Sequence, residues 1–341
     1  MSNKFFSLDE IKDKLQVPEQ ADFIEAFFNW QISKWQFARE NYTALESVKV
    51  KRFNFPDTSV LVQYNPHRVG SIMALTDEKS IANRKCFLCN ENLHAEQVGV
   101  KLTENYTLLV NPFPVISIHF TAKFNSHVPQ KISENLIEIL NGAQTLGDNY
   151  FLLYNGPEAG ASVPEHRHFQ GGAKNKLPFL KDIITKIENR YKANSDLTLM
   201  DVLDFKQTKL FAVQDEIRNY FVITGVNASE IEEMFFNLFN VFTSLFGAEK
   251  EIKLNLISTV EKGKHYLVIF PRAKHHPSCF FEEGEKQLLV RPSTLDIGGI
   301  IVLPREEDFN KITKEKIKEI FSEVGISNDD FKHIISEVKK H

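Results

Sequence analysis

The sequence has little of what marks several common classes of protein. Its 341 residues include only three cysteines, too few for a disulfide framework. No run of about eighteen apolar residues occurs, so no membrane-spanning helix is expected. The formal net charge of −4 argues against a general nucleic-acid-binding protein, which is usually basic. The first residues lack the long apolar core of a secretion signal, which favours a cytoplasmic protein with reduced thiols.

The chain is long enough for two domains or for one duplicated domain with a large core. Apolar periodicity predicts helix from Leu8 to about Asn41, as a pair of helices over one end of the fold, begun by a capping box of Ser7 and Glu10. Alternating residues predict a hairpin of two strands, 48–55 and 59–64.

Beyond the hairpin, the sequence predicts the same order of strands and helix in two places. Two strands, a helix and two strands are expected from Tyr106 to Gln170, and the same order returns from Leu210 to Phe270. In the first copy the second strand is expected at 115–121, and Ser133 is expected to begin the helix; in the second copy Ser229 has that role. Helices are expected at the C-terminal end. The fold class expected is therefore α+β, with two antiparallel-sheet halves and packing helices.

A Cys-x-x-Cys pair, Cys86 and Cys89, is the first candidate for site chemistry. Two thiolates at this spacing can bind one metal ion, and two nitrogen ligands would complete a tetrahedron. The rival interpretation is a redox pair. A redox Cys-x-x-Cys usually starts a helix after a strand, and Asn83-Arg84-Lys85 does not read as a strand.

The second candidate is the stretch Gly160–Gly172, in which His166, His168 and Gln170 alternate with other residues. In a strand these three side chains would project from one face. Because buried polar groups need partners, such a face makes a poor core. The spacing alone leaves open an exposed edge strand with two chance histidines. His94 and His119 are interpreted as incidental.

Together these motifs resemble the galactose-1-phosphate uridylyltransferase branch of the histidine-triad superfamily, and within it the phosphorylases of nucleoside diphosphate sugars or dinucleoside polyphosphates. The resemblance implies a duplicated fold in which only one half keeps the nucleophile, and C-terminal strands at 288–291 and 296–303. It implies that His168 attacks the α-phosphorus and that Gln170 holds the phosphoryl oxygens. It also implies a structural zinc ion, with iron as the alternative metal, bound by Cys86, Cys89, His127 and His166.

The resemblance further implies that substrate phosphates are bound by Arg68, Asn155, Gly160 and Ser162. Two positions depart from the family pattern: Glu165 is an extra residue before the first histidine, and Ser71 stands where the uridylyltransferases have an arginine. From the residues themselves, Arg272 and Lys274 are candidates for holding a sugar phosphate or an incoming phosphate, because they follow a predicted strand in a cationic loop. The alternative for that loop is a solvated surface.

The function expected is nucleotidyl transfer through a covalent nucleotidyl-histidine, with phosphorolysis of a nucleotide sugar as the first candidate. A hexose-1-phosphate uridylyltransferase and a dinucleoside polyphosphate phosphorylase are the alternatives within the superfamily. A non-catalytic, zinc-stabilised nucleotide-binding protein is the alternative from another class. The partners expected are a nucleotide substrate and a phosphate or sugar phosphate, with no nucleic acid or membrane, in a monomer or homodimer. The expected domains are 1–45 (helices), 46–177 (catalytic half), 178–304 (degenerate half) and 305–341 (helices).

Overall fold

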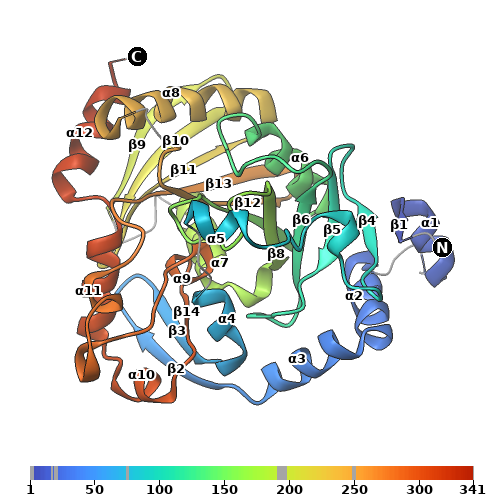
Figure 1. Cartoon of the computed structure of the whole chain (residues 1–341). Helices are drawn as coiled ribbons and strands as arrows, with labels where there is room; N and C mark the ends of the chain where they lie inside the picture. The colour runs from blue at the N-terminus through green and yellow to red at the C-terminus, as the bar shows by residue number, and fades with distance from the viewer. Residues whose placement is uncertain are drawn as a thin grey trace.

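The structure, a computed structural model, describes residues 4–16, 18, 22–73, 77–189, 198–247 and 251–340. Within these ranges the chain is α+β and is organised around an 11-stranded sheet (Figure 1). In spatial order its strands are β1 (Phe5–Phe6), β4 (Gly99–Lys101), β5 (Tyr106–Val110), β6 (His119–Phe124), β8 (His168–Ala173), β7 (Tyr150–Asn155), β12 (Leu254–Glu261), β13 (Lys264–Pro271), β11 (Asn219–Gly225), β10 (Thr208–Gln214) and β9 (Thr198–Phe205).

The predicted repeat is confirmed in the order and pairing of these strands. The first half runs β5, β6, α6 (Leu136–Leu146), β7, β8, and the second runs β10, β11, α8 (Ala228–Phe246), β12, β13. In space the two halves meet at the antiparallel pair β7 and β12, where Asn155 lies opposite Asn255. The strand order on one side of this pair mirrors the order on the other, so the halves are related by an approximate two-fold axis.

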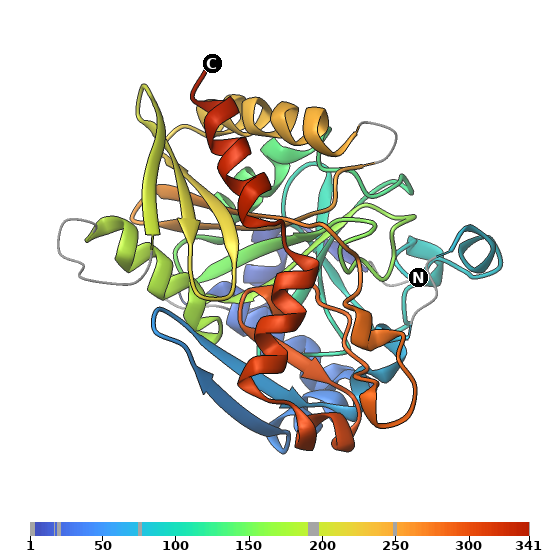
Figure 2. The ribbon, with the colours of Figure 1, turned by 90° about the vertical axis from the view of Figure 1, so that its left-hand side faces the viewer.

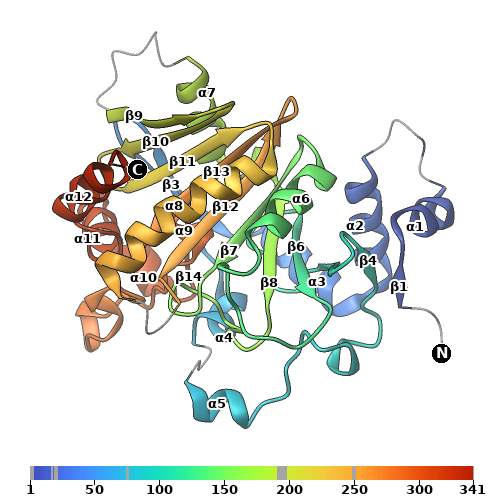
Figure 3. The same ribbon diagram turned by 90° about the horizontal axis from the view of Figure 1, so that it is seen from above.

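Helices cover one face of the large sheet. Figure 3 shows α6 and α8 lying across the strands on the same side. Their buried faces, including Leu140 and Phe235, join α12 (Asn328–Val338) and the facing strand residues in one apolar core. This core is continuous across the β7–β12 junction, because apolar burial on both sides favours a single packed layer.

The opposite face packs against α7 (Pro178–Glu188) and a second, 3-stranded sheet. That sheet consists of β2 (Lys49–Asn54), β3 (Ser59–Tyr64) and β14 (Ile300–Leu303), with β14 parallel to β3. The C-terminal helices run along one side of the molecule beside both sheets (Figure 2). They are α10 (Glu306–Lys311), α11 (Lys314–Val324) and α12. No helix within the described ranges combines the length and the apolar character needed to cross a membrane.

The N-terminal prediction is right about helix and about the capping box but wrong about number. Among the described residues of this part, three helices are present, α1 (Leu8–Leu15), α2 (Phe23–Lys34) and α3 (Gln36–Glu46). The Ser7 hydroxyl accepts from the Glu10 amide, and the Glu10 carboxylate accepts from the Ser7 amide. Trp35 separates α2 from α3 because its backbone is extended, with φ −117° and ψ 97°.

Several strand and cap predictions are corrected. β6 begins at His119 rather than at Val115, because Gln63 and Asn65 bind the carbonyls of residues 115 and 114 and hold this segment away from the ladder. Asn227, not Ser229, caps α8. At α6 the Ser133 hydroxyl binds Glu251 instead of capping the helix. Residues 288–291 form no strand, since α9 (Thr294–Ile297) and β14 follow an extended loop, and β9 was not predicted. The sequence also predicts a helix from Phe179 to Tyr191; α7 is that helix, and the predicted end lies outside the described residues.

Candidate active site

The histidine segment starts as a loop and enters the sheet at His168. In β8, Phe169 points into the core beneath α6, so His168 and Gln170 point to the opposite face. The next residue, Gly171, leaves no room for a side chain, since a Cβ there would lie 2.2 Å from the Phe151 carbonyl oxygen. His166 precedes the strand and is not part of the alternating row that the sequence predicted.

His166 instead belongs to a Cys2His2 cluster. The Sγ of Cys86 lies 3.3 Å from His166 Nδ1, and the Sγ of Cys89 lies 3.2 Å from His127 Nδ1. All four ligand atoms are within 4.8 Å of one another. Two ligands of one tetrahedral zinc ion would be separated by about 3.5 Å, given zinc–sulfur and zinc–nitrogen bonds of about 2.3 and 2.0 Å. The residues present therefore fit a metal ion.

Two further observations support that fit. His166 Nε2 lies 2.9 Å from the Phe124 carbonyl oxygen, so the ring can donate there and leave Nδ1 as the ligand atom. Burial raises the pKa of the Cys86 thiol to about 11, and a bound cation would reverse that shift by stabilising the thiolate. A metal held here would join the loop of Cys86 and Cys89 to the segment that presents His168.

An ion pair makes the same connection beside the cluster. Arg84 donates through Nε and Nη2 to the two carboxylate oxygens of Glu165, at 3.0 and 2.8 Å. Arg84 Nη2 also donates to the carbonyl of Ser162. Glu165, in the histidine segment, is therefore the ion-pair partner of Arg84, which stands two residues before Cys86. Paired bonds of this kind fix the relative orientation of the two side chains.

His168 is held with one ring nitrogen toward the protein. Its Nδ1 lies 2.8 Å from the His166 carbonyl oxygen and donates to it, which leaves Nε2 unprotonated in the neutral ring. Within the described residues Nε2 has no hydrogen-bond partner, and the side chain lines a cavity of about 540 Å³. Burial lowers the pKa of His168, so burial favours the neutral, nucleophilic form.

Gln130 fixes the backbone of His168. Its Oε1 accepts from the His168 amide at 2.8 Å, and its Nε2 donates to the His168 carbonyl at 2.9 Å. The same Nε2 donates to the carbonyl of Asn155 on β7. Gln130 is 1% exposed, so these bonds are made in a dry environment where they resist displacement by water.

Gln170 is oriented by a histidine that sequence reasoning set aside. His119 Nδ1 accepts from the Val115 amide at 3.3 Å, so the proton of the neutral ring is on Nε2. That Nε2–H donates to Gln170 Oε1 at 3.1 Å. The amide group of Gln170 is thereby turned with its NH2 away from His119, as a donor for a group in the cavity.

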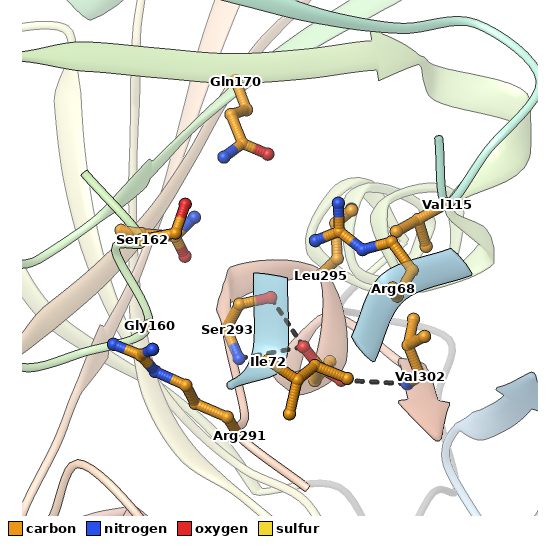
Figure 4. Close-up of a pocket in the computed structure, with 12 residues that line it drawn as sticks. Arg68, Ile72, Val115, Gly160, Ser162, Gln170, Arg291, Ser293, Leu295 and Val302 are labelled. Atoms are coloured by element: carbon orange, nitrogen blue, oxygen red, sulfur yellow. Dashed lines mark hydrogen bonds between the residues drawn. The ribbon is translucent and has the colours of Figure 1, made fainter. Parts of the chain in front are cut away.

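Two cavities meet beside His168 and Gln170. The large one has an aromatic wall made of Trp35, Phe37, Phe87, His94 and Phe113. The small one, of about 40 Å³, is shown in Figure 4, where Arg68 and Gln170 face the same space from different elements. Arg68, Ser162 and Gln170 line both cavities. A ligand that spans the two cavities would pass these three residues.

Arg68 and Asn155 both offer donors to the small cavity. Arg68 ends the 3-10 turn Pro66–Arg68, and its Nη1 donates to the Phe113 carbonyl at 2.8 Å. Burial lowers the pKa of its guanidinium to about 10, which still leaves the group charged at neutral pH. Asn155 Oδ1 accepts from the amide and hydroxyl of Thr294, so the Asn155 NH2 remains for a ligand.

Comparisons with known proteins bear on the family and the fold of this chain. Residues 27–173 match the family described as a domain of unknown function (DUF4922), and residues 186–341 match the family described as GDPGP1-like, C-terminal domain. The structure of yeast Ap4A phosphorylase Apa2 superposes with a TM-score of 0.53 at 16% identity, covering 85% of this chain and 94% of that chain. The Apa2 complex with Ap4A gives a TM-score of 0.54 at 17% identity, covering 85% and 96%. No curated protein matches the sequence.

The chain has a HIT-like fold, the fold of the yeast Ap4A phosphorylase Apa2. The first half of this HIT-like chain carries His166, His168 and Gln170. The second half has Tyr266–Phe270 in β13, the counterpart of β8, with no His-x-His-x-Gln. The predicted fold class is confirmed.

The structure does not bring Arg272 or Lys274 to either cavity, and the expectation of direct substrate contact is corrected. All five N–H groups of Arg272 are used: they donate to Asn255 and to the carbonyls of residues 324, 292, 274 and 275. Lys274 is exposed and lies 3.5 Å from Glu323. Arg272 contacts the small cavity only indirectly. It donates to Asn255, and Asn255 in turn donates to Asn155, which lines that cavity.

Sequence reasoning missed four residues that contact this HIT-like site: Arg84, His119, Gln130 and Arg291. Arg84 stands two residues before Cys86, a position that gave no signal of its own. Their roles depend on hydrogen bonds to other segments, which are up to 130 residues away in the chain. Local spacing carries no information about such contacts. Among the described residues the Cys2His2 cluster is the one group that fits a metal, and His275, His276 and Cys279 do not form a second.

Proposed function

We propose that the protein is a nucleotidyltransferase that acts through a nucleotidyl intermediate on His168, and that it is a phosphorylase of nucleoside diphosphate sugars. The observation that carries the proposal is the His168 ring, whose Nδ1 donates to the His166 carbonyl. Its Nε2 has no hydrogen-bond partner among the described residues, and the side chain lines the cavity. A non-catalytic binding protein would have no need of a nucleophile held in this way.

The proposed reaction has two displacements. In the first, His168 Nε2 attacks the α-phosphorus of the nucleotide sugar, the bond from that phosphorus to the bridging oxygen breaks, and sugar 1-phosphate leaves with the electron pair. In the second, an oxygen of inorganic phosphate attacks the α-phosphorus, the phosphorus–nitrogen bond breaks, and nucleoside diphosphate leaves. The His166 carbonyl stabilises the positive charge that the ring carries in between.

The other residues have roles in this proposal that follow from their positions. Gln170 and Ser162 lie where the two cavities meet and would bind oxygens of the α-phosphoryl group. Arg68 lines both cavities and would bind oxygens of the neighbouring phosphoryl group, and Asn155 and Gly160 line the small cavity. The metal proposed is zinc in a closed Cys2His2 set, with a structural role that fixes the segment before His168. The compartment proposed is the cytoplasm, where the thiols remain reduced.

A dinucleoside polyphosphate is the second candidate substrate, because the Apa2 structures superpose over 85% of this chain. The same two displacements would then release a nucleotide in place of the sugar phosphate. Hexose 1-phosphate as the acceptor would make the protein a uridylyltransferase instead.

The test is a panel of nucleotide sugars and dinucleoside polyphosphates, each incubated with radiolabelled phosphate, with hexose 1-phosphate or with neither. Label appearing in nucleoside diphosphate supports a phosphorylase. Intact-protein mass spectrometry without acceptor should show one added nucleotidyl group, absent in His168→Gly. The variant should lose several powers of ten in rate, as covalent catalysts do on loss of the nucleophile. Normal turnover by His168→Gly would exclude the mechanism.

A further inference from the structure

The small cavity beside Gln170 is completed by a segment that the second half contributes. Arg291 lies in the loop between β13 and α9, is 7% exposed and lines the cavity. Its Nη2 donates to the Ala161 carbonyl at 3.1 Å, in the turn that leads to the histidine segment. Figure 4 shows its side chain extending to the segment that contains Gly160 and Ser162.

This loop is fitted closely to the turn of the first half. Gly160 has a φ of +96°, which favours glycine, and a Cβ there would lie 2.7 Å from the Cα of Ser293. Neither segment can therefore move away from the other without opening the cavity wall. Arg291 and Ser293 are placed as firmly as residues of the first half.

The side chain of Arg291 is held by a hydrogen bond to a neutral histidine, His275. Its Nε donates to His275 Nε2 at 3.2 Å, so that nitrogen is unprotonated. Burial lowers the pKa of His275, and the neighbouring arginine acts in the same direction. The His276 ring stacks on His275 with centroids 4.1 Å apart, which limits rotation of the supporting ring.

The charges around the small cavity favour an anion. Arg68 and Arg291 supply two guanidinium groups, and the pKa of Arg291, lowered by burial to about 10, leaves it charged at neutral pH. The carboxylate that lines the cavity, Asp296, already accepts from Ser293 and from the Val302 amide. The volume of about 40 Å³ equals roughly three to four water-sized spaces, which suits a phosphoryl group and is too small for a hexose ring.

We propose that Arg291, together with Arg68, binds the second phosphoryl group of the reaction. This inference rests on the proposed function. In the first displacement the site holds the β-phosphate of the nucleotide substrate, and in the second it holds inorganic phosphate. The second half thus supplies a substrate-binding residue to the histidine of the first half. Arg291 takes the place that the sequence suggested for Arg272 and Lys274.

The experiment compares ligands that differ by this one phosphoryl group. Isothermal titration identifies which of AMP, GMP, UMP and CMP the wild-type protein binds best, and then measures the corresponding diphosphate. For Arg291→Gln we expect the diphosphate Kd to rise at least tenfold, the monophosphate Kd to change less than twofold, and the KM for inorganic phosphate to rise at least tenfold. Lys274→Gln removes a nearby cation outside the cavity and should leave all three values unchanged.

Different results would exclude the role of Arg291 and the proposed function. If the wild-type protein turns over substrate and Arg291→Gln changes neither the diphosphate Kd nor the phosphate KM, the role of Arg291 is excluded and the proposed function stands. A wild-type protein that binds no nucleotide excludes both. If Arg291→Gln does not fold by thermal unfolding, His275→Leu replaces it, because it removes the acceptor of Arg291 Nε. A threefold to tenfold rise in the diphosphate Kd supports the role, and an unchanged Kd excludes it.

Discussion

The Nε2 of His119 lies 3.1 Å from the Oε1 of Gln170 and donates a hydrogen bond to it. The direction of this bond follows from the other ring nitrogen, which accepts from the Val115 amide. Because an amide has one acceptor end and one donor end, the bond decides which end of Gln170 faces the substrate. His119 is therefore a positioning residue for Gln170.

We predict that His119→Leu lowers kcat about tenfold and leaves the KM for the nucleotide substrate within threefold, since one orienting hydrogen bond contributes about 1–1.5 kcal/mol. His119→Gln, which can keep an N–H donor, should retain most of the activity. Steady-state kinetics of both variants, in the wild-type and Gln170→Ala backgrounds, provide the measurement. In the Gln170→Ala background His119→Leu should have less than a twofold effect. An equal loss in both backgrounds would show that His119 acts in some other way.

The same histidine predicts a dependence of stability on pH. Burial, followed by the charge of Arg68, lowers the folded-state pKa of His119 to about 3, below its usual value of 6.5. The unfolded chain therefore binds more protons between pH 3 and 6.5, so His119 contributes stability that is complete above pH 6.5 and is lost as the pH falls through this window. Urea unfolding at pH 5, 6 and 7 should show a shallower acid decline for His119→Gln, by up to about 1.4 kcal/mol per pH unit. Parallel declines for both proteins would contradict the buried, neutral state.

Removal of the metal should affect the position of His168 rather than the overall fold. We predict that Cys86→Ser lowers the metal content measured by elemental analysis and reduces turnover by at least tenfold, because the segment before His168 loses its anchor. Far-ultraviolet circular dichroism should remain close to that of the wild type, since both apolar cores lie outside the cluster. Cys279→Ser is the matched control, as that cysteine is buried elsewhere. Full activity in metal-free Cys86→Ser would refute the anchoring role.

Much of the fold could be predicted from the sequence because the same local periodicity of apolar residues occurs in both halves. The two copies of strand, strand, helix, strand and strand were predicted from periodicity, and the spatial order of strands confirms them. The Cys2His2 set came from the resemblance, and the structure brings all four ligand atoms together. Their binding of zinc stays a prediction, as do the domain boundaries.

What the sequence could not predict depends on contacts between distant segments. The Val115 segment has the composition of a strand. Gln63 and Asn65 donate to the carbonyls of residues 115 and 114, however, and the strand begins only at His119. The sequence predicts that Arg272 binds phosphate, but its guanidinium donates to five acceptors from four separate segments of the protein. The sequence does not identify Arg291, because the residue is placed at the cavity by its hydrogen bond to the Ala161 carbonyl, which is 130 residues away in the chain.

The pairing of β7 with β12 has a consequence for how such a chain can change over time. A two-fold symmetric dimer would hold these two strands in separate subunits, whereas here one polypeptide supplies both. Once the partners are covalently linked, one copy is free to lose its reactive ring so long as it still offers β12 as a neighbour. The second copy is then retained as a scaffold, and its loops are free to acquire groups that face the cavity of the first copy, as Arg291 does.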